Sequence, residues 1–143
     1  MKKTIFTMAI LTSALLADTI YVSNEKDNTI SVIDSLTNKV TNTIKVGQRP
    51  RGILLSTDYS KLYICASDDD TVQVMDTKTN KILYNLPSGE DPEQFALTPD
   101  GKELYISNED DAIVTVVDTE KKSVTAQIEV GVEPEGIDRK SVV

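Results

Sequence analysis

Short stretches in which apolar and polar residues alternate recur along this chain, and turn-forming residues separate them. Alternation with a period of two is typical of half-buried β-strands, and β-branched and aromatic residues favour the same assignment. Segments rich in Asp, Ser, Thr, Asn, Gly and Pro join the stretches, as expected for tight turns. The clearest set predicts four short strands: GILLS (52–56), LYICAS (62–67), TVQVMD (71–76) and KILYNL (81–86).

The whole set recurs at a constant spacing. Tyr21, Tyr63 and Tyr105 are 42 residues apart. A period of about 40 to 50 residues that contains four strands is typical of a β-propeller blade. We therefore predict an all-β fold, a β-propeller segment of about three four-stranded antiparallel blades with repeats at 18–59, 60–101 and 102–143. Other positions recur at the same spacing: Asp34, Asp76 and Asp118; Gly47, Gly89 and Gly131; and Pro50, Pro92 and Pro134.

These recurring residues are interpreted as structural turns. Each aspartate ends a predicted strand and precedes Ser or Thr, so its carboxylate can accept hydrogen bonds from the backbone that follows. In each Gly-x-x-Pro the glycine provides conformational freedom and the proline fixes φ, which suits a connection between blades. All nine positions are expected to shape the backbone and to take no part in catalysis.

The first 17 residues have a different pattern. Lys2 and Lys3 precede an apolar run that ends in small residues near Ala17 and is too short to span a bilayer. This pattern predicts a secretory signal peptide at 1–17 and leaves 18–143 as the propeller segment. We expect a periplasmic or secreted protein that has no membrane span after cleavage. The single cysteine, Cys65, is expected to be a buried strand residue.

Charge narrows the choice of partner. The 143 residues carry a formal net charge of −8 and include no histidine. Nucleic-acid binding depends on lysine and arginine displacing counterions, so the charge argues against a nucleic-acid partner. It favours a basic protein partner, such as a cytochrome-like carrier or a component of a quinoprotein system.

The charges also divide between the two ends of the predicted blades. Loops between second and third strands emerge at one end together with the loops between blades. In the second and third repeats these loops are acidic and contain no lysine or arginine, whereas the other loops carry most of the lysines. The acids either solvate polar turns, dock a basic partner or weakly hold a divalent cation. The candidate docking residues are Asp68, Asp69, Asp70, Glu90, Asp91, Glu93, Glu109, Asp110, Asp111, Glu133 and Glu135.

No motif points to catalysis or to a bound cofactor. The sequence lacks the Cys-x-x-Cys-His of haem attachment, a histidine ligand, a Gly-x-Ser-x-Gly elbow and a phosphate-binding glycine loop. The acidic runs SDDDT and NEDDA lack the ligand spacing of an EF-hand. We therefore expect a protein that is not an enzyme and has no catalytic residues, no cofactor and no dedicated metal site.

Several segments resemble known propellers. LYISN and IYVSN, with NTISVID, TIKVGQRP and ALTPDGKELYISN, resemble the YVTN-repeat β-propellers. The longer segments YVSNEKDNTISVID, VGQRPRGI, ISNEDDAIVTVVD and VGVEPEGI resemble periplasmic propellers associated with PQQ-dependent alcohol catabolism. The resemblance implies a seven-bladed accessory protein without defined catalytic residues.

Three functions are consistent with this resemblance. The preferred one is an exported, non-catalytic binding or scaffold module that is accessory to PQQ-dependent (quinoprotein) alcohol catabolism. The first alternative is a cell-surface or envelope structural or adhesive repeat protein. The second is a redox-associated, cytochrome d1-like propeller.

Three blades are too few to close a ring, because propellers have about four to eight. The repeat provides the outer three strands of one blade, two whole blades and the first strand of a fourth. In that last strand Asp138 and Arg139 occupy the positions of Leu54 and Leu55. This favours a truncated copy of a longer protein. The alternative is a natively short protein whose 134–143 strand completes the first blade, either within the chain or in a homo-oligomer.

Overall fold

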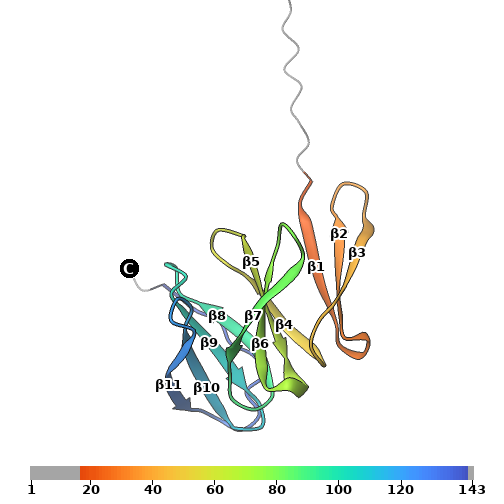
Figure 1. Cartoon of the computed structure of the whole chain (residues 1–143). Coiled ribbons are helices and arrows are strands. Elements are labelled where there is room, and N and C mark those ends of the chain that lie inside the picture. The colour runs from red at the N-terminus through yellow and green to blue at the C-terminus, as the bar shows by residue number, and fades with distance from the viewer. Residues whose placement is uncertain (1–16, 142–143) are drawn as a thin grey trace, which may run out of the picture.

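The computed structural model describes residues 17–141, which form eleven β-strands in three antiparallel sheets (Figure 1). Within each sheet, every strand pairs with the strands next to it in chain order. The all-β, partial-propeller prediction is therefore confirmed. The first sheet contains β1 (Thr19–Asn24), β2 (Thr29–Asp34) and β3 (Lys39–Lys45). The second contains β4 (Pro50–Leu55), β5 (Lys61–Ala66), β6 (Thr71–Asp76) and β7 (Lys81–Pro87). The third contains β8 (Pro92–Leu97), β9 (Glu103–Asn108), β10 (Ile113–Asp118) and β11 (Ser123–Glu129).

Two single-turn 3-10 helices, Glu25–Asp27 and Ser67–Asp69, interrupt the strand pattern at equivalent loops. Within residues 17–141 we find no helix of the length and apolarity needed to cross a membrane. The predicted signal peptide, except for Ala17, lies outside the described residues.

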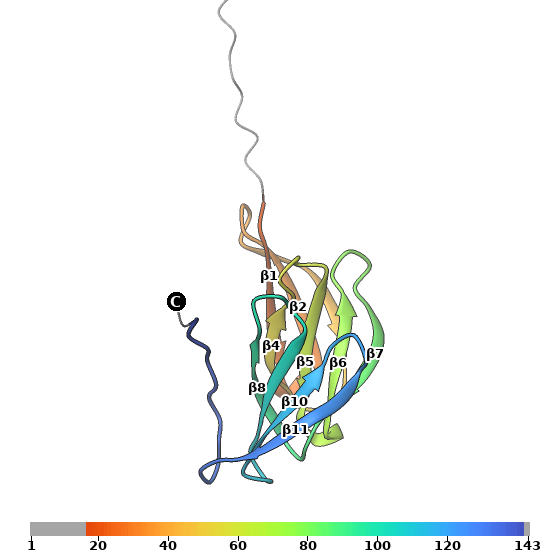
Figure 2. The same ribbon diagram turned by 90° about the vertical axis from the view of Figure 1, so that its left-hand side faces the viewer.

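The fourth blade begins differently from the expectation. Residues 130–141 form no strand, although they follow the same Gly-x-x-Pro pattern that leads into β4 and β8. Asp138 and Arg139 interrupt the apolar alternation of this segment, and no strand within the described residues pairs with it. The segment instead runs beside the blades and is largely exposed (Figure 2).

Apolar residues on both faces of the middle sheet hold the blades together. In β5, Leu62 and Ile64 belong to the cluster shared with the first sheet, whereas Tyr63 and Cys65 belong to the cluster shared with the third. This follows from the period-two alternation of a strand. Cys65 is fully buried, as expected, and burial raises the pKa of its thiol. The larger cluster consists of Tyr63, Cys65, Val72, Val74, Leu86, Phe95, Leu97, Leu104, Ile106 and Val117.

The recurring aspartates lie where the third strand of each blade ends. Each carboxylate accepts backbone hydrogen bonds from residues two or three positions further on. Hydrogen bonds lower the pKa of all three groups, chiefly the bond from the Thr79 hydroxyl at Asp76 and the backbone bonds at Asp34 and Asp118. They therefore hold the turns into the outermost strands. Oδ1 of Asp34 accepts from Leu36 N and Thr37 N (3.0 and 2.7 Å), Asp76 from Thr79 N (2.6 Å), and Asp118 from Glu120 N and Lys121 N (3.0 and 2.8 Å).

The glycines of the first two Gly-x-x-Pro turns serve a different purpose from the expected one. Neither Gly47 nor Gly89 has a positive φ, so conformational freedom is not their role. A Cβ at Gly47 would lie 2.6 Å from both Ala66 Cβ and Asp69 Oδ2. Only glycine allows this close approach between the turn and the blade that follows it.

Candidate functional site

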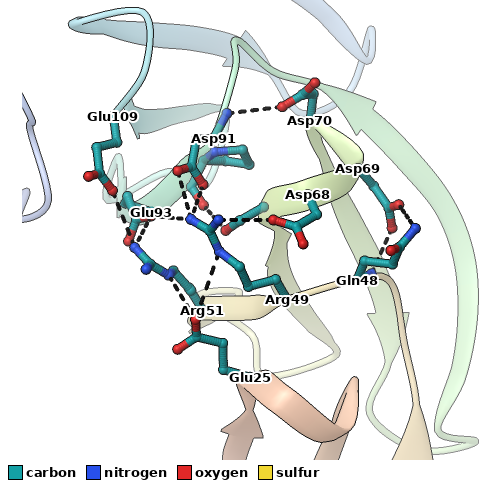
Figure 3. A network of polar contacts seen from close by, with 12 residues as sticks. Glu25, Gln48, Arg49, Arg51, Asp68, Asp69, Asp70, Asp91, Glu93 and Glu109 are labelled. Atoms are coloured by element: carbon teal, nitrogen blue, oxygen red, sulfur yellow. Dashed lines mark hydrogen bonds and ion pairs between the residues drawn. The ribbon is translucent and has the colours of Figure 1, made fainter.

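The entrances to β4 and β8 form the most highly charged site among the described residues (Figure 3). These two strands are the first, and therefore innermost, strands of adjacent blades. The residue before each proline is left-handed, with φ of 49° at Arg49 and 47° at Asp91. Two residues further on, Arg51 and Glu93 occupy a second pair of equivalent positions. Opposite charges therefore face each other across the two blades.

Arg49 is the centre of the first contact. Its Nη2 lies 2.7 Å from both carboxylate oxygens of Asp91, and its Nη1 lies 2.9 Å from Asp68 Oδ1. Charge-assisted hydrogen bonds of this kind are stronger than neutral ones. They connect the start of the middle blade to its own β5–β6 loop and to the next blade.

Arg51 makes the second contact. Its Nη1 donates hydrogen bonds to Glu93 and, at 3.3 Å, to Glu109 Oε2. Its Nε lies 3.6 Å from Glu25 Oε1, which belongs to the first blade. One guanidinium therefore contacts carboxylates from two other blades.

Burial changes the chemistry of the acids. Asp91 and Glu93 are only 8% and 6% exposed. Loss of solvent raises the pKa of Glu93 to about 7; Arg51 opposes this shift, and the carboxyl groups of Glu109 and Asp91 add to it. Glu93 therefore changes its protonation state near neutral pH.

The cluster also has the composition of a weak cation site. Oxygens from Asp91, Glu93 and Glu109 lie within 4.8 Å of one another. Carboxylate oxygens suit hard divalent cations. However, Arg49 and Arg51 already bring two positive charges to the same oxygens, so a cation would have to compete with them. The arrangement itself is a charge-compensated joint between blades.

Several predicted docking residues are used internally. Asp69 Oδ2 accepts a hydrogen bond from Gln48 N at 2.8 Å, and Asp111 Oδ2 accepts one from Glu90 N at the same distance. Asp70 Oδ1 accepts one from Asp91 N at 3.0 Å. These aspartates therefore fix the connections between blades.

The predicted docking residues thus divide by exposure. Asp91 and Glu93 are buried against arginines rather than exposed to a partner, and Glu109 is half-buried beside Arg51. We call the exposed remainder the acidic end. It consists of Asp68, Asp69, Asp70, Glu90, Asp110, Asp111, Glu133 and Glu135.

Sequence reasoning missed both arginines and Glu25. It considered the loops of the second and third repeats only, whereas Glu25, Arg49 and Arg51 all lie in the first repeat. A signal was present in the repeat itself. Arg49 aligns with Asp91 and Arg51 with Glu93 at the 42-residue spacing, so equivalent positions in adjacent blades have opposite charges.

Most of the sequence matches a known family. The YNCE-like beta-propeller family matches residues 2–110. The chain belongs to this family. This membership confirms the general propeller resemblance, and the match covers the first two sheets together with β8 and β9 of this YNCE-like β-propeller. No curated protein sequence matches the chain.

Solved structures resemble this YNCE-like propeller in fold. Kuenenia stuttgartiensis hydrazine synthase matches with a TM-score of 0.76 and 24% identity, over 82% of this chain and 34% of the other. Dihydro-heme d1 dehydrogenase NirN in complex with DHE matches with a TM-score of 0.66 and 18% identity, over 80% and 25%. The chain thus spans about a third or a quarter of these proteins, and the likeness concerns the fold alone.

Proposed function

We propose that this chain is an exported, non-catalytic β-propeller module that binds a basic protein partner through its acidic end. The observation that carries the proposal is the uneven charge of the loops. Eight carboxylates remain exposed at this end, and one of them, Asp68, contacts Arg49. The other close contacts of Arg49 and Arg51 include the buried or half-buried Asp91, Glu93 and Glu109. Such a field attracts a basic surface and orients its approach.

The proposed context is the periplasm, as an accessory to PQQ-dependent alcohol catabolism. The support for this part is the resemblance of the YVSNEKDNTISVID and VGQRPRGI segments to propellers of that system, together with the signal-peptide pattern at 1–17. A cytochrome-like carrier with a basic face fits the charge of the acidic end. Release of the protein by osmotic shock would support a periplasmic location, and retention on the envelope would favour the surface-protein alternative.

The docking proposal is tested by neutralising Glu90 and Asp110, two exposed acids whose side chains accept no hydrogen bond from any residue of 17–141. The double variant Glu90→Gln/Asp110→Asn should weaken binding to a basic c-type cytochrome by about three- to tenfold at low salt. The difference from the unaltered chain should shrink as salt is added, because exposed charges are screened. Calorimetric titration at several ionic strengths measures both effects.

The matched control removes two charges from the opposite end. Glu103 and Glu120 lie in or beside the other set of loops and are exposed. The variant Glu103→Gln/Glu120→Gln changes the net charge equally and should bind almost as the unaltered chain does. If both double variants lose affinity equally, only net charge matters and there is no docking end.

A further inference from the structure

The outer edge of the middle blade is both unpaired and apolar. β7 pairs with β6 on one side, and no strand within residues 17–141 pairs with its other side (Figure 2). Ile82 and Leu83 of this strand are 36% and 48% exposed. The first and third blades both pack against the middle blade, so a missing neighbour does not cause this exposure. Exposed apolar strand edges are sites at which another strand can add.

Leu83 departs from the repeat. Thr41 in β3 and Thr125 in β11 occupy its position at the 42-residue spacing, and in all three blades the strand register shifts at this point. The Thr41 hydroxyl donates a hydrogen bond to Val32 O at 3.2 Å. The Thr125 hydroxyl donates one to Val116 O at 3.3 Å. Two blades therefore use this position for a local hydrogen bond, whereas β7 presents an exposed leucine.

The two ends of β7 differ in charge. Lys78 and Lys81 are exposed at its start, where the carboxylate of Asp76 is bound to the turn backbone. A third cation comes from the next blade, because Lys122 Nζ lies 3.6 Å from the centre of the tyrosine ring of β7. At the other end Glu90 is exposed in the loop that follows the strand. A partner strand that fits this edge is apolar in the middle and carries the opposite charges at its two ends.

We propose that β7 of one copy lies antiparallel beside β7 of a second copy and forms a two-fold symmetric dimer. The second copy meets each requirement, because it presents the same apolar edge and, when reversed, the complementary order of charges. Lys78 of each copy then lies near Glu90 of the other, so the same ion pair forms twice. A parallel arrangement would instead bring like charges together. The contact is self-complementary, as two-fold symmetry requires.

The strand itself sets the position of the two-fold axis. Pro87 has no N–H to donate, so pairing is limited to residues 81–86. Near the middle of this stretch Tyr84 is half-buried against the third blade, whereas Leu83 is exposed. The axis therefore passes close to Leu83, which meets its own counterpart, and Ile82 lies opposite Tyr84. Contact between the two leucines removes apolar surface from water.

Leu83→Thr provides the sharpest test, because threonine is the native residue at the equivalent position of the other two blades. The chain should stay folded, as measured by circular dichroism. The dimer dissociation constant should rise about tenfold or more, because both leucines are lost from the contact. Sedimentation velocity over a concentration series measures this. Val124→Thr removes an exposed apolar side chain of similar size from β11 and should associate as the unaltered chain does.

Charge exchange tests the orientation independently. Lys78→Glu should weaken the dimer by about tenfold at low salt, because it brings two carboxylates together at both ends of the contact. Lys78→Glu/Glu90→Lys exchanges the two charges and should recover most of the affinity. Lys102→Glu makes the same charge change in the exposed turn between β8 and β9, away from β7, and should have little effect.

The position of the axis is tested by crosslinking. Leu83→Cys should form a covalent dimer on oxidation, because directly opposed residues of antiparallel strands bring Cβ atoms within disulfide range. Thr41→Cys and Thr125→Cys, on the outer strands of the other blades, should not. The native Cys65 is fully buried and does not compete. The proposal is overturned if the unaltered chain stays monomeric at its highest soluble concentration, if Leu83→Thr associates normally, or if all three cysteine variants crosslink equally.

Discussion

Gly89 shows how a single hydrogen atom in place of a methyl group allows the connection between two blades to approach the blade that follows it. An added Cβ would lie 2.7 Å from Asp111 Oδ2 and 2.9 Å from Asn108 Cγ. We therefore expect Gly89→Ala to lower the free energy of unfolding by about 1–3 kcal/mol. Urea denaturation followed by circular dichroism measures this. Gly136→Ala, where nothing lies within 4 Å, is the control, and equal stability of both variants would contradict the packing explanation.

Glu93 gives the fold a pH dependence. Burial raises its pKa from 4.5 to about 7, so between these values the folded chain holds a proton that the unfolded chain has released. The contribution of this group is therefore fully present below about pH 4.5 and is lost as pH rises through about 7. Glu93→Gln, which imitates the protonated carboxyl, should reduce this loss. Denaturation at pH 5 and pH 8 measures the effect, and identical pH profiles would exclude it.

At this scale the sequence predicts backbone roles better than side-chain pairs. The position of Asp76 before a Thr at a strand end is enough to predict its turn hydrogen bonds, because those partners are local in sequence. The contacts of Arg49 and Arg51 reach 42 residues along the chain, and only the packing of two blades brings them together. The close approach at Gly47 is also hidden, because it depends on how the connection folds against the blade that follows it.

Between elements, the Arg49–Asp91 contact joins the start of β4 to the start of β8. Asp91 is buried, so removing its cation leaves an uncompensated carboxylate. We expect Arg49→Gln to lower stability by about 3 kcal/mol and the double variant Arg49→Gln/Asp91→Asn to recover much of this loss. Denaturant titration of the unaltered chain, of both single variants Arg49→Gln and Asp91→Asn, and of the double variant gives the coupling free energy. Additive losses in the double variant would show that the pair is not coupled.

Strands should differ in hydrogen exchange according to their place in the sheets. β5 is paired on both sides and nearly all of it is buried, whereas β11 is an edge strand with every residue exposed. Amides of β5 should therefore exchange slowest and those of β11 among the fastest of the strands. Exchange measured by mass spectrometry on the dilute chain tests this order. Equal protection of the two strands would contradict it.

Strand positions were predictable because each strand carries its own alternation and is bounded by turn residues. β6 matches the stretch 71–76 at both ends, while β4 begins earlier than the predicted 52–56, at Pro50. The segment after β11 was the exception. Its opening motif suggested a strand, but a strand needs a partner, and alternation within residues 134–137 cannot provide one.

At the scale of the whole molecule, the middle sheet buries apolar residues on both faces, one cluster against the first sheet and one against the third. The described blades are therefore coupled through this sheet, and we expect them to unfold together. Ile64→Ala, at a fully buried position of β5, should lower the free energy of unfolding by about 2–5 kcal/mol. Urea denaturation followed by circular dichroism measures this loss, and separate transitions for different blades would contradict the coupling.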